Sequence, residues 1–412
     1  MADLAVELYG LRVGTLRGRG AALDFVAEEA AVATFGLDSL VLSVSVPLAV
    51  VPARGRKERR QNFFRELLPE GRLLTRLAQE ANVAEHDVVG LLRAYGRDVA
   101  GALQIWDPEG PGEPRTPALE PLDEAGVADL LASASTFPLA NKPNGGKTSL
   151  NGVQDKIVLA RTPSGWARAL DGYPSTHILK PVSRDHPTIV FDEEYGARFA
   201  RALGLSSFAT RIERFAGTPA LVVERYDREV PPDGGVPHRI HQEDFNQALG
   251  TRGDQKYQRY GGKVSLARIA QELSRLGQRD SVARLARLTV LAVALGNLDL
   301  HAKNVALLHP QDGSVALAPA YDVVPQAHLP NDGELALAVD GVYRHAAVER
   351  SHLVTEIASW GVRAAGELVD EALAAIADVV AREAPVEGAY PGLVDDVARF
   401  TTNLRAGRPA GA

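Results

Sequence analysis

The order of strand-like and helix-like segments predicts an α+β chain: a β-rich lobe followed by an all-helical lobe, with an added N-terminal subdomain. Alternating apolar and polar residues gather before residue 225, whereas apolar residues recur at helical spacing from Val264 onward. A proline- and glycine-rich stretch at 107–114 is typical of a linker. Because 412 residues are long for one core, we expect three parts, 1–107, 108–228 and 229–412.

The first part has the pattern of a small α+β unit. Period-two alternation predicts strands at 5–9, 13–16 and 40–44. Between residues 62 and 81 the apolar residues fall partly at helical spacing, and Pro69 and Gly71 divide this stretch into two helices.

The second part combines strands with one helix, and the third is rich in helices. Residues 191–203 carry acids early and arginines late, an order that suits a helix dipole. The predicted strands are 157–160, 166–170 and 176–180, with a hairpin formed by 211–215 and 220–224. Helices are predicted at 264–276, 281–296 and 364–383.

Composition excludes several classes of protein. The net charge of −7 gives no general attraction to nucleic acid, and the absence of cysteine excludes disulfides and thiolate zinc sites. No segment reaches the roughly 20 apolar residues that cross a bilayer. The N-terminus also lacks the basic start of a signal peptide. We therefore expect a cytoplasmic protein that makes no membrane contact. The histidine spacings do not fit a zinc site, and no Gly-x-Ser-x-Gly elbow of a serine hydrolase occurs.

The most informative pattern is an aspartate, an asparagine five residues later, and a second aspartate after a short hairpin. These residues are Asp299, Asn304 and Asp322. Apolar strands at 305–308 and 315–318 fold the chain back, so we expect Asn304 and Asp322 to lie close together. Protein kinases supply a catalytic base and two Mg²⁺ ligands in this way. Taken singly, the same residues also fit turns and helix caps.

Two further segments supply what phosphoryl transfer would need. Lys180 lies in an apolar strand, and the following helix offers Glu193 and Glu194 to orient a lysine that holds nucleotide phosphates. The alternative is a solvent-facing lysine on an edge strand. Residues 224–227 end another strand, and they fit either a connection that meets adenine or a salt-bridged strand end.

The glycine-rich stretch at 144–152 does not match a Walker A loop, since position 141 is asparagine and a strand is expected to follow. We expect instead a flexible loop over the phosphates, with Ser149 and Gly152 near the γ-phosphate. A serine in that position is a candidate for self-phosphorylation, and a plain turn residue is the alternative.

These segments together resemble the HipA family of serine/threonine-protein kinases, and they occur in the family's order. The resemblance covers most of the chain. It rests on 62–70 and 96–103, on the loop Ser149-Leu150-Asn151-Gly152-Val153-Gln154-Asp155-Lys156, and on 176–181, 223–228, 241–250, 297–304 and 321–325. The loop departs from the family pattern at Leu150-Asn151, where small residues are expected.

The resemblance implies a protein-kinase-like fold and an ATP- and Mg²⁺-dependent serine/threonine kinase. Asp299 would then be the catalytic base, Asn304 and Asp322 the metal ligands, and Ser149 the residue whose autophosphorylation switches the enzyme off. The residues expected at ATP are Lys180, Gly152, Val153, Gln154, Glu224, Tyr226, His301 and Lys303.

The resemblance also implies partners, because family members are the toxin halves of bacterial toxin–antitoxin pairs. We expect a helix-turn-helix, HipB-like antitoxin, and operator DNA bound mainly through it. The expected protein substrate belongs to the translation machinery, with an aminoacyl-tRNA synthetase as one candidate, and its phosphorylation would arrest growth and induce persistence. Two alternatives remain: a catalytically weak kinase-fold module that acts as antitoxin partner and co-repressor, and a small-molecule kinase. The complete set of catalytic residue types favours the protein kinase, and the family-like N-terminal unit argues against the small-molecule kinase.

Overall fold

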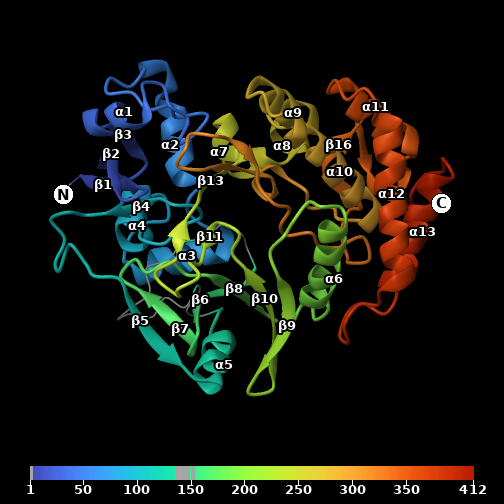
Figure 1. The fold of residues 1–412 in the computed structure, drawn as a ribbon, viewed down its shortest axis with the longest axis horizontal. Coiled ribbons are helices and arrows are strands. Elements are labelled where there is room, and N and C mark those ends of the chain that lie inside the picture. The colour runs from blue at the N-terminus through green and yellow to red at the C-terminus, as the bar shows by residue number, and fades with distance from the viewer. Residues whose placement is uncertain (1–2, 136–138, 140–148, 150–153) are drawn as a thin grey trace. The chain divides into compact units, whose positions relative to one another are not determined.

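A computed structural model describes residues 3–135, 139, 149 and 154–412 of the chain. The chain divides into two compact units (Figure 1). The first unit consists of Met1–Pro181, Glu213–Gly253 and Leu308–Ser314. The second consists of Val182–Ile212, Asp254–Leu307 and Val315–Ala412. Each unit therefore combines segments that are far apart in the sequence.

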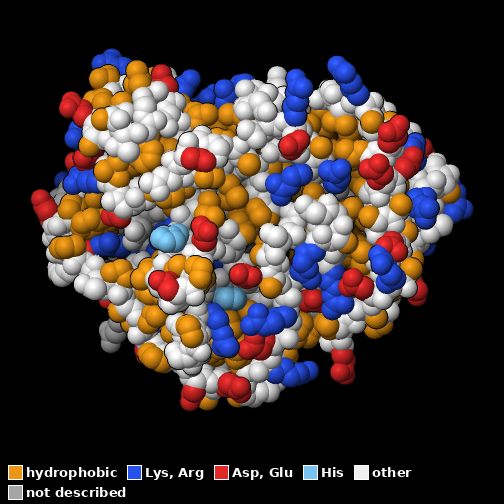
Figure 2. Space-filling model, in the orientation of Figure 1, with side chains coloured by type: hydrophobic (Ala, Val, Ile, Leu, Met, Phe, Trp, Pro, Cys, Tyr) orange, Lys and Arg blue, Asp and Glu red, His pale blue; other side chains and the backbone are white. Residues whose placement is uncertain are grey.

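Charged side chains of both signs are spread over the face of the molecule drawn in Figure 2, where Lys and Arg lie among Asp and Glu. This mixture agrees with the modest net charge of −7. Within the described ranges, no helix is both long enough and apolar enough to span a membrane.

The first unit begins with a four-stranded antiparallel sheet in the order β3-β2-β1-β4, accompanied by four helices. The predicted strands near 5–9 and 13–16 and the helix break at Pro69 and Gly71 are confirmed. The elements are β1 (Leu4–Leu8), β2 (Leu11–Arg19), β3 (Ala22–Ala27), α1 (Glu29–Phe35), a 3-10 turn at Arg54–Arg56, α2 (Lys57–Arg65), α3 (Gly71–Glu80), α4 (Val88–Tyr95) and β4 (Gln104–Trp106).

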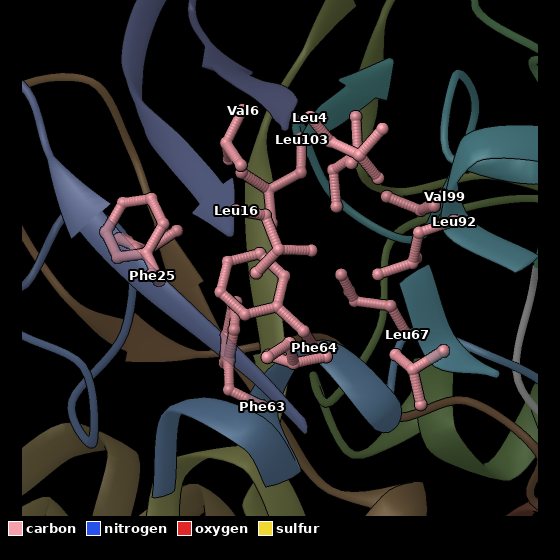
Figure 3. Packing of buried hydrophobic residues seen from close by; sticks show 14 of the residues in the cluster. Leu4, Val6, Leu16, Phe25, Phe63, Phe64, Leu67, Leu92, Val99 and Leu103 are labelled. Atoms are coloured by element: carbon pink, nitrogen blue, oxygen red, sulfur yellow. The ribbon is translucent and has the colours of Figure 1, made fainter. Parts of the chain in front are cut away.

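One apolar core joins this sheet to its helices (Figure 3). Phe63 and Phe64 on α2 are fully buried, and the Phe64 ring lies 5.5 Å from that of Phe25 on β3. Leu67, Leu92 and Val99 belong to the same cluster. The core therefore extends to the segment after α4, where the polar contacts described below begin.

The predicted strand at 40–44 is wrong. Val41, Leu42 and Ser43 are buried, but the segment is irregular. The Glu243 carboxylate accepts hydrogen bonds from the Val44 amide at 2.7 Å and from the Ser43 hydroxyl at 2.6 Å. His241 Nε2 lies 2.7 Å from the Leu42 carbonyl. Buried polar groups must be paired, and here distant side chains take the place of a neighbouring strand.

The rest of the first unit is built on a six-stranded sheet in the order β5-β7-β6-β8-β10-β9. Helix α5 (Glu124–Ala132) contributes Val127, Leu130 and Leu131 to the core of this sheet. The strands are β5 (Ala118–Leu122), β6 (Ile157–Thr162), β7 (Gly165–Leu170), β8 (His177–Pro181), β9 (Thr210–Phe215) and β10 (Thr218–Glu224), as the alternation predicted for all but β5. They are followed by β11 (Arg228–Glu229), β12 (His238–Arg239), β13 (His241–Asp244) and α7 (Phe245–Leu249).

The second unit is mainly helical, with α10 (Arg279–Leu295) as its central helix. Twelve of the 17 residues of α10 are buried, and burial is continuous over 288–295, the last two turns of the helix. Around it lie α6 (Ile189–Ala202), α9 (Leu266–Arg275), α11 (Arg350–Ser359), α12 (Ala365–Arg382) and α13 (Leu393–Arg405). The unit also contains α8 (Gln258–Gly261), 3-10 turns at Ala302–Asn304 and His345–Ala347, the hairpin strands β14 (Ala306–His309) and β15 (Ala316–Leu317), and the pair β16 (Glu334–Val339) and β17 (Val342–Arg344), which the sequence analysis did not predict. β14 ends in the first unit.

Candidate active site

Lys180 lies on an inner strand of the first unit's large sheet. It is buried on β8, between β6 and β10, and pairs in register with Leu221. The alternative of a solvent-facing edge lysine is therefore wrong. An inner strand held on both sides by ladders gives a lysine a fixed backbone position.

The predicted adenine connection follows directly after β10. Glu224 is the last residue of the strand and pairs with His177, and the Arg225 amide donates to the Thr176 carbonyl at 2.9 Å. The Glu224 residue is exposed, and the half-buried Tyr226 donates its hydroxyl to Gln242 Oε1. The two predicted contacts to adenine thus flank a residue with a different environment, the buried Arg225.

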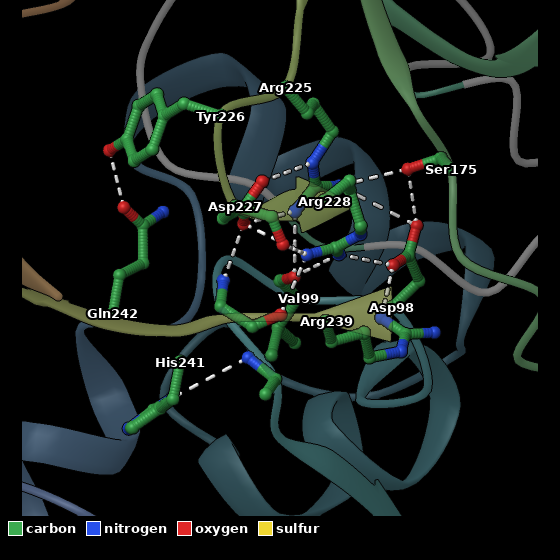
Figure 4. Close-up of polar contacts among 12 residues, drawn as sticks. Asp98, Val99, Ser175, Arg225, Tyr226, Asp227, Arg228, Arg239, His241 and Gln242 are labelled. Carbon is green, nitrogen blue, oxygen red and sulfur yellow. Dashed lines mark hydrogen bonds and ion pairs between the residues drawn. The ribbon is translucent and has the colours of Figure 1, made fainter. Parts of the chain in front are cut away.

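A buried ionic cluster surrounds this connection (Figure 4). It contains Arg225, Arg228 and Arg239, together with Asp98 and Asp227. Burial alone would raise the pKa of Asp227, but Arg225 and Arg228 outweigh burial and hold that pKa at about 2. Burial and the neighbouring Arg225 lower the pKa of Arg228 to about 10. Asp227 and Arg228 are therefore both charged at neutral pH.

The phosphate-loop predictions fall partly on described residues. Gly152 and Val153 lie outside them. Gln154 is described, and its Nε2 atom is buried without a hydrogen-bond partner among the described residues. A buried amide nitrogen of this kind is expected to meet a polar ligand or water.

Ser149 is fully buried against residues of the N-terminal part of the first unit. Its hydroxyl donates to the Leu67 carbonyl at 2.9 Å, and its amide donates to the Asp98 carbonyl at 3.0 Å. In this conformation the hydroxyl is sheltered from solvent. Any phosphorylation of Ser149 therefore requires the hydroxyl to leave the Leu67 carbonyl and become accessible.

In the second unit, Asp299 follows the end of the central helix. Gly296 ends α10 in the left-handed conformation with φ 66°, and the Asn297 side chain accepts the Asp299 amide at 3.1 Å. The Asp299 side chain is 41% exposed, and its Oδ1 accepts a hydrogen bond from the Tyr257 hydroxyl at 3.4 Å. The carboxylate is thus oriented by a neighbour while it stays accessible to a substrate.

Asn304 and Asp322 flank the predicted hairpin, which the structure confirms. The Ala318 amide donates to the Ala306 carbonyl at 2.8 Å, and the Tyr321 hydroxyl donates to the Lys303 carbonyl at 2.7 Å. The last bond joins the residues directly before Asn304 and Asp322, so these two segments lie side by side.

The donor set of these residues fits a hard divalent cation. The Asn304 amide nitrogen donates to the Asp299 carbonyl at 2.8 Å, which directs that nitrogen inward and leaves Oδ1 as the ligand atom. Asp322 adopts the left-handed conformation with φ 52°, which is uncommon for a residue other than glycine. Backbone strain of this kind gathers at functional sites. Among the described residues there is no group of three or more His, Asp or Glu side chains that could hold a metal. Mg²⁺ is usually bound by one or two carboxylates together with waters and substrate phosphates.

His301 and Lys303 lie within the same segment and are both buried. His301 Nε2 lies 3.8 Å from Asp299 Oδ1, and the His301 ring packs edge-to-face against Tyr257 at 5.3 Å. Both predicted ATP contacts are therefore close in the chain to the predicted base, in the unit that does not contain Lys180.

Helix α6 packs against the segment that follows Asp322, a contact that the sequence analysis did not predict. Asp192 on α6 accepts the Tyr390 amide at 2.8 Å, and its Oδ2 lies 3.3 Å from His328 Nε2. The rings of His328 and Tyr390 stack with centroids 4.2 Å apart. A Cβ atom at Gly196 would lie 2.0 Å from the Val323 carbonyl oxygen, so the helix backbone touches the residue after Asp322.

The ionic cluster around Asp98 was also missed, because its members come from separate parts of the sequence. The only sequence signal was that 96–103 and 223–228 both resemble family segments. That signal marks the segments and does not show that they touch.

Comparison with known proteins finds two family models that match this chain, and several relatives. Residues 148–385 match the model of the HipA-like C-terminal domain, and residues 4–106 match that of the HipA N-terminal domain. The putative kinase Y4mE of Sinorhizobium fredii is 37% identical over 304 residues, which cover 71% of this chain and 70% of that protein. The serine/threonine-protein kinase toxin HipA of Shewanella oneidensis is 29% identical over 311 residues, or 73% of this chain and 70% of that protein.

A solved structure of Shewanella oneidensis HipA with HipB and operator DNA matches 98% of this chain and 96% of that chain. The TM-score is 0.78 and the sequence identity is 26%. The similarity confirms the predicted kinase-like α+β fold. On the strength of both domain matches and these relatives, the chain belongs to the HipA family.

Proposed function

We propose that the chain is an ATP- and Mg²⁺-dependent protein serine/threonine kinase that acts as the toxin of a toxin–antitoxin pair. The observation that carries the proposal is that Asp299, with an accessible carboxylate, is hydrogen-bonded through its carbonyl to Asn304, and that the residue before Asn304 is bonded to the residue before Asp322. Membership of the HipA family and relatives named as kinases support it.

In the proposed reaction, the hydroxyl oxygen of a serine or threonine forms a bond to the γ-phosphorus of ATP. The bond between that phosphorus and the β,γ-bridging oxygen breaks, ADP leaves, and Asp299 accepts the hydroxyl proton. Tyr257 donates to the Asp299 carboxylate and so fixes its orientation. The Asn304 amide oxygen and the Asp322 carboxylate would hold Mg²⁺, which neutralises charge that develops on the phosphates.

The remaining predicted residues bind the nucleotide in this proposal. Lys180, His301 and Lys303 supply positive charge or donors for the phosphates, and Gln154 supplies its unpaired amide nitrogen. Glu224 and Tyr226 place the adenine.

Autophosphorylation of Ser149 is proposed as the off-switch. Phosphorylation adds about −1.5 to −2 charges at neutral pH, and the buried position against the Leu67 carbonyl cannot accept that charge. A phosphorylated Ser149 is therefore unable to return to the sheltered position, so modification leaves this segment in a different place.

The proposed partners are a helix-turn-helix antitoxin and, through it, operator DNA. Support comes from the Shewanella oneidensis relative, whose structure contains HipB and operator DNA. The net charge of −7 opposes phosphate contact by the chain alone. In a mobility-shift assay at near-physiological salt we expect retardation of operator DNA only when the antitoxin is present. Tight binding by the isolated chain would contradict this. The proposed substrate is a protein of the translation machinery, with an aminoacyl-tRNA synthetase as the first candidate.

The decisive experiment compares wild-type protein with Asp299→Asn. Transfer of labelled phosphate should fall by ~10²–10⁴-fold, the usual effect of losing a positioned base, while ATP affinity stays close to wild type. Asp312→Asn, on an exposed turn of the hairpin, is the matched control and should keep full activity. An Asp299→Asn rate equal to that of the control would remove Asp299 from the mechanism. Induced expression should arrest growth for wild type and Asp312→Asn only.

A further inference from the structure

The residue between the two proposed adenine contacts points into the protein. In the connection 224–227, Glu224 is exposed and Tyr226 is half-buried, whereas the Arg225 side chain is 2% exposed. Glu224 ends β10, and residues 225–228 form a turn in which the Arg228 amide donates to the Arg225 carbonyl at 3.2 Å, so these residues belong to one short hydrogen-bonded segment. Whatever holds Arg225 therefore also fixes the side on which Glu224 and Tyr226 are presented.

The Arg225 guanidinium donates four hydrogen bonds to groups around it. Its Nε and Nη2 atoms donate to the Asp227 carboxylate at 2.9 Å and 2.8 Å, a bidentate pair within the connection itself. Nη1 donates to the Ser175 hydroxyl at 2.8 Å, and Nη2 also donates to the Val99 carbonyl at 3.1 Å. A guanidinium fixed by several planar hydrogen bonds has little rotational freedom.

Asp98 fixes the partners of Arg225 from the N-terminal domain. Its Oδ2 accepts the Ser175 hydroxyl at 2.6 Å, and its Oδ1 accepts Arg228 at 2.9 Å and Arg239 at 2.6 Å (Figure 4). Arg225 Nη1 lies 3.7 Å from the same carboxylate. Burial would raise the pKa of Asp98, but the three arginines outweigh it and hold the pKa well below its usual range.

The backbone around Asp98 completes the attachment. The Gly101 amide donates to Asp227 Oδ2 at 2.7 Å, and the Gly101 carbonyl accepts Arg228 at 2.9 Å. Gly101 has φ +78°, and a Cβ atom there would lie 2.6 Å from the Gln242 amide, so only glycine fits this close approach. The segment 98–101 thus binds Arg225 and Asp227 of the connection through one carbonyl and one amide, and the adjoining Arg228 through one carboxylate and one carbonyl.

The charge balance makes Asp98 the critical member. Three guanidinium groups face two carboxylates, which leaves one excess positive charge in a buried site. Removal of the Asp98 charge leaves three cations with one anion, and uncompensated buried charges are strongly unfavourable. Arg225 and Arg228 would then separate, and the connection that contains Arg225 would move with them.

We propose that Asp98 is a positioning residue for nucleotide binding: from the N-terminal domain it fixes the connection 224–227 in the conformation that receives adenine, without touching the nucleotide. The proposal rests on the proposed function, in which Glu224 and Tyr226 meet adenine. The N-terminal domain would then influence ATP affinity through Asp98. The backbone carbonyl of the same residue accepts a hydrogen bond from the Ser149 amide.

The test measures ATP binding and turnover separately in the full chain. Asp98→Asn keeps the side-chain volume and removes the charge. We expect its dissociation constant and KM for ATP to rise by about tenfold, equivalent to about 1.4 kcal/mol, with kcat at saturating ATP close to wild type. Asp107→Asn breaks another Arg–Asp pair of the N-terminal domain, Arg93–Asp107 at 2.9 Å, and should leave ATP binding unchanged.

Two further variants keep the test decisive if Asp98→Asn does not fold. Ser175→Ala removes one hydroxyl that bridges Asp98 and Arg225, and should give a smaller rise in KM in the same direction. The double variant Asp98→Asn/Arg239→Gln restores one excess positive charge, with two cations and one anion, and should recover part of the affinity. A general loss of structure would not produce such a recovery.

The outcomes separate this inference from the proposed function. Wild-type protein that binds no ATP refutes the proposed function. If wild-type protein binds ATP and folded Asp98→Asn and Ser175→Ala bind it equally well, the positioning role is refuted and the proposed function stands. A fall in kcat without a change in KM would likewise overturn the positioning role.

Discussion

Replacement of Gly196 by alanine should displace the segment that carries Asp322. The new Cβ atom would lie 2.0 Å from the Val323 carbonyl oxygen and 3.2 Å from Pro325 Cδ. Close carbon–oxygen contacts in proteins are about 3.3 Å, so helix α6 and residue 323 must separate by about 1.3 Å, the difference between 3.3 and 2.0. No side-chain rotation relieves the contact, because Cβ and the carbonyl are both fixed to the backbone.

The displacement should lower both stability and activity. Overpacking costs about 1–3 kcal/mol, from which the higher helix propensity of alanine returns about 1 kcal/mol. A misplacement of about 1 Å at a catalytic site can reduce the rate by ~10²-fold. We therefore expect a lower melting temperature and a kcat reduced by one to two orders of magnitude. The loss should lie in phosphoryl transfer, the step for which Asp322 is proposed to hold Mg²⁺.

The assay measures kcat as a function of Mg²⁺ concentration, together with thermal unfolding. Gly366→Ala, also on a helix of the second unit, is the matched control, since among the described residues its Cβ would meet only Arg350, at 3.5 Å. That variant should keep full activity and an equal or slightly higher melting temperature. If Gly196→Ala behaves like Gly366→Ala, α6 and the segment after Asp322 are not coupled and the reasoning fails.

Three further predictions follow from the site. Asp322→Ala should abolish most of the gain in nucleotide affinity that Mg²⁺ provides, measured by calorimetric titration with and without Mg²⁺, and a retained gain would disprove the metal assignment. Ser149→Ala should remove the phosphate that mass spectrometry finds after incubation with ATP and Mg²⁺ and should leave an enzyme that no longer switches itself off; an undiminished phosphate signal on the chain would place the modification elsewhere. The folded-state pKa of Asp227 is lowered from 3.8 to about 2, so its contribution is complete above pH 4 and is lost as pH falls toward 2. This corresponds to about 2 kcal/mol, and Asp227→Asn should flatten the acid limb of a pH–stability curve by that amount if the ionic cluster contributes as described.

Local patterns predicted most of the elements because their causes are local. The hairpin after Asn304 follows from two apolar strands around a turn sequence, and the break between α2 and α3 follows from Pro69 and Gly71. Helix α10 is buried continuously over its last two turns and follows from its apolar run. The strand expected at 40–44 failed for the opposite reason, since its hydrogen bonds go to Glu243, about 200 residues away.

The candidate site divides in the same way. That the segments of Asp299, Asn304 and Asp322 lie together could be predicted because they belong to one short stretch around a hairpin, whereas the roles of the three residues stay predictions. The clusters around Asp98 and Asp192 could not be predicted, because each joins residues more than 70 positions apart. A single charged residue in a sequence does not show which distant charge it faces, and only the fold supplies that information.

The position of the Asp98 cluster has a consequence for how such chains can recombine. Asp98 belongs to the segment that matches the N-terminal family model, and its three arginines belong to the segment that matches the C-terminal one. A chimera that takes the two segments from different relatives can be joined in the linker without disturbing a core. Its N-terminal segment must still supply the buried carboxylate that the arginines of its C-terminal segment require. The two segments are therefore expected to be inherited as a pair, although the sequence between them contains a linker that looks like a convenient point of exchange.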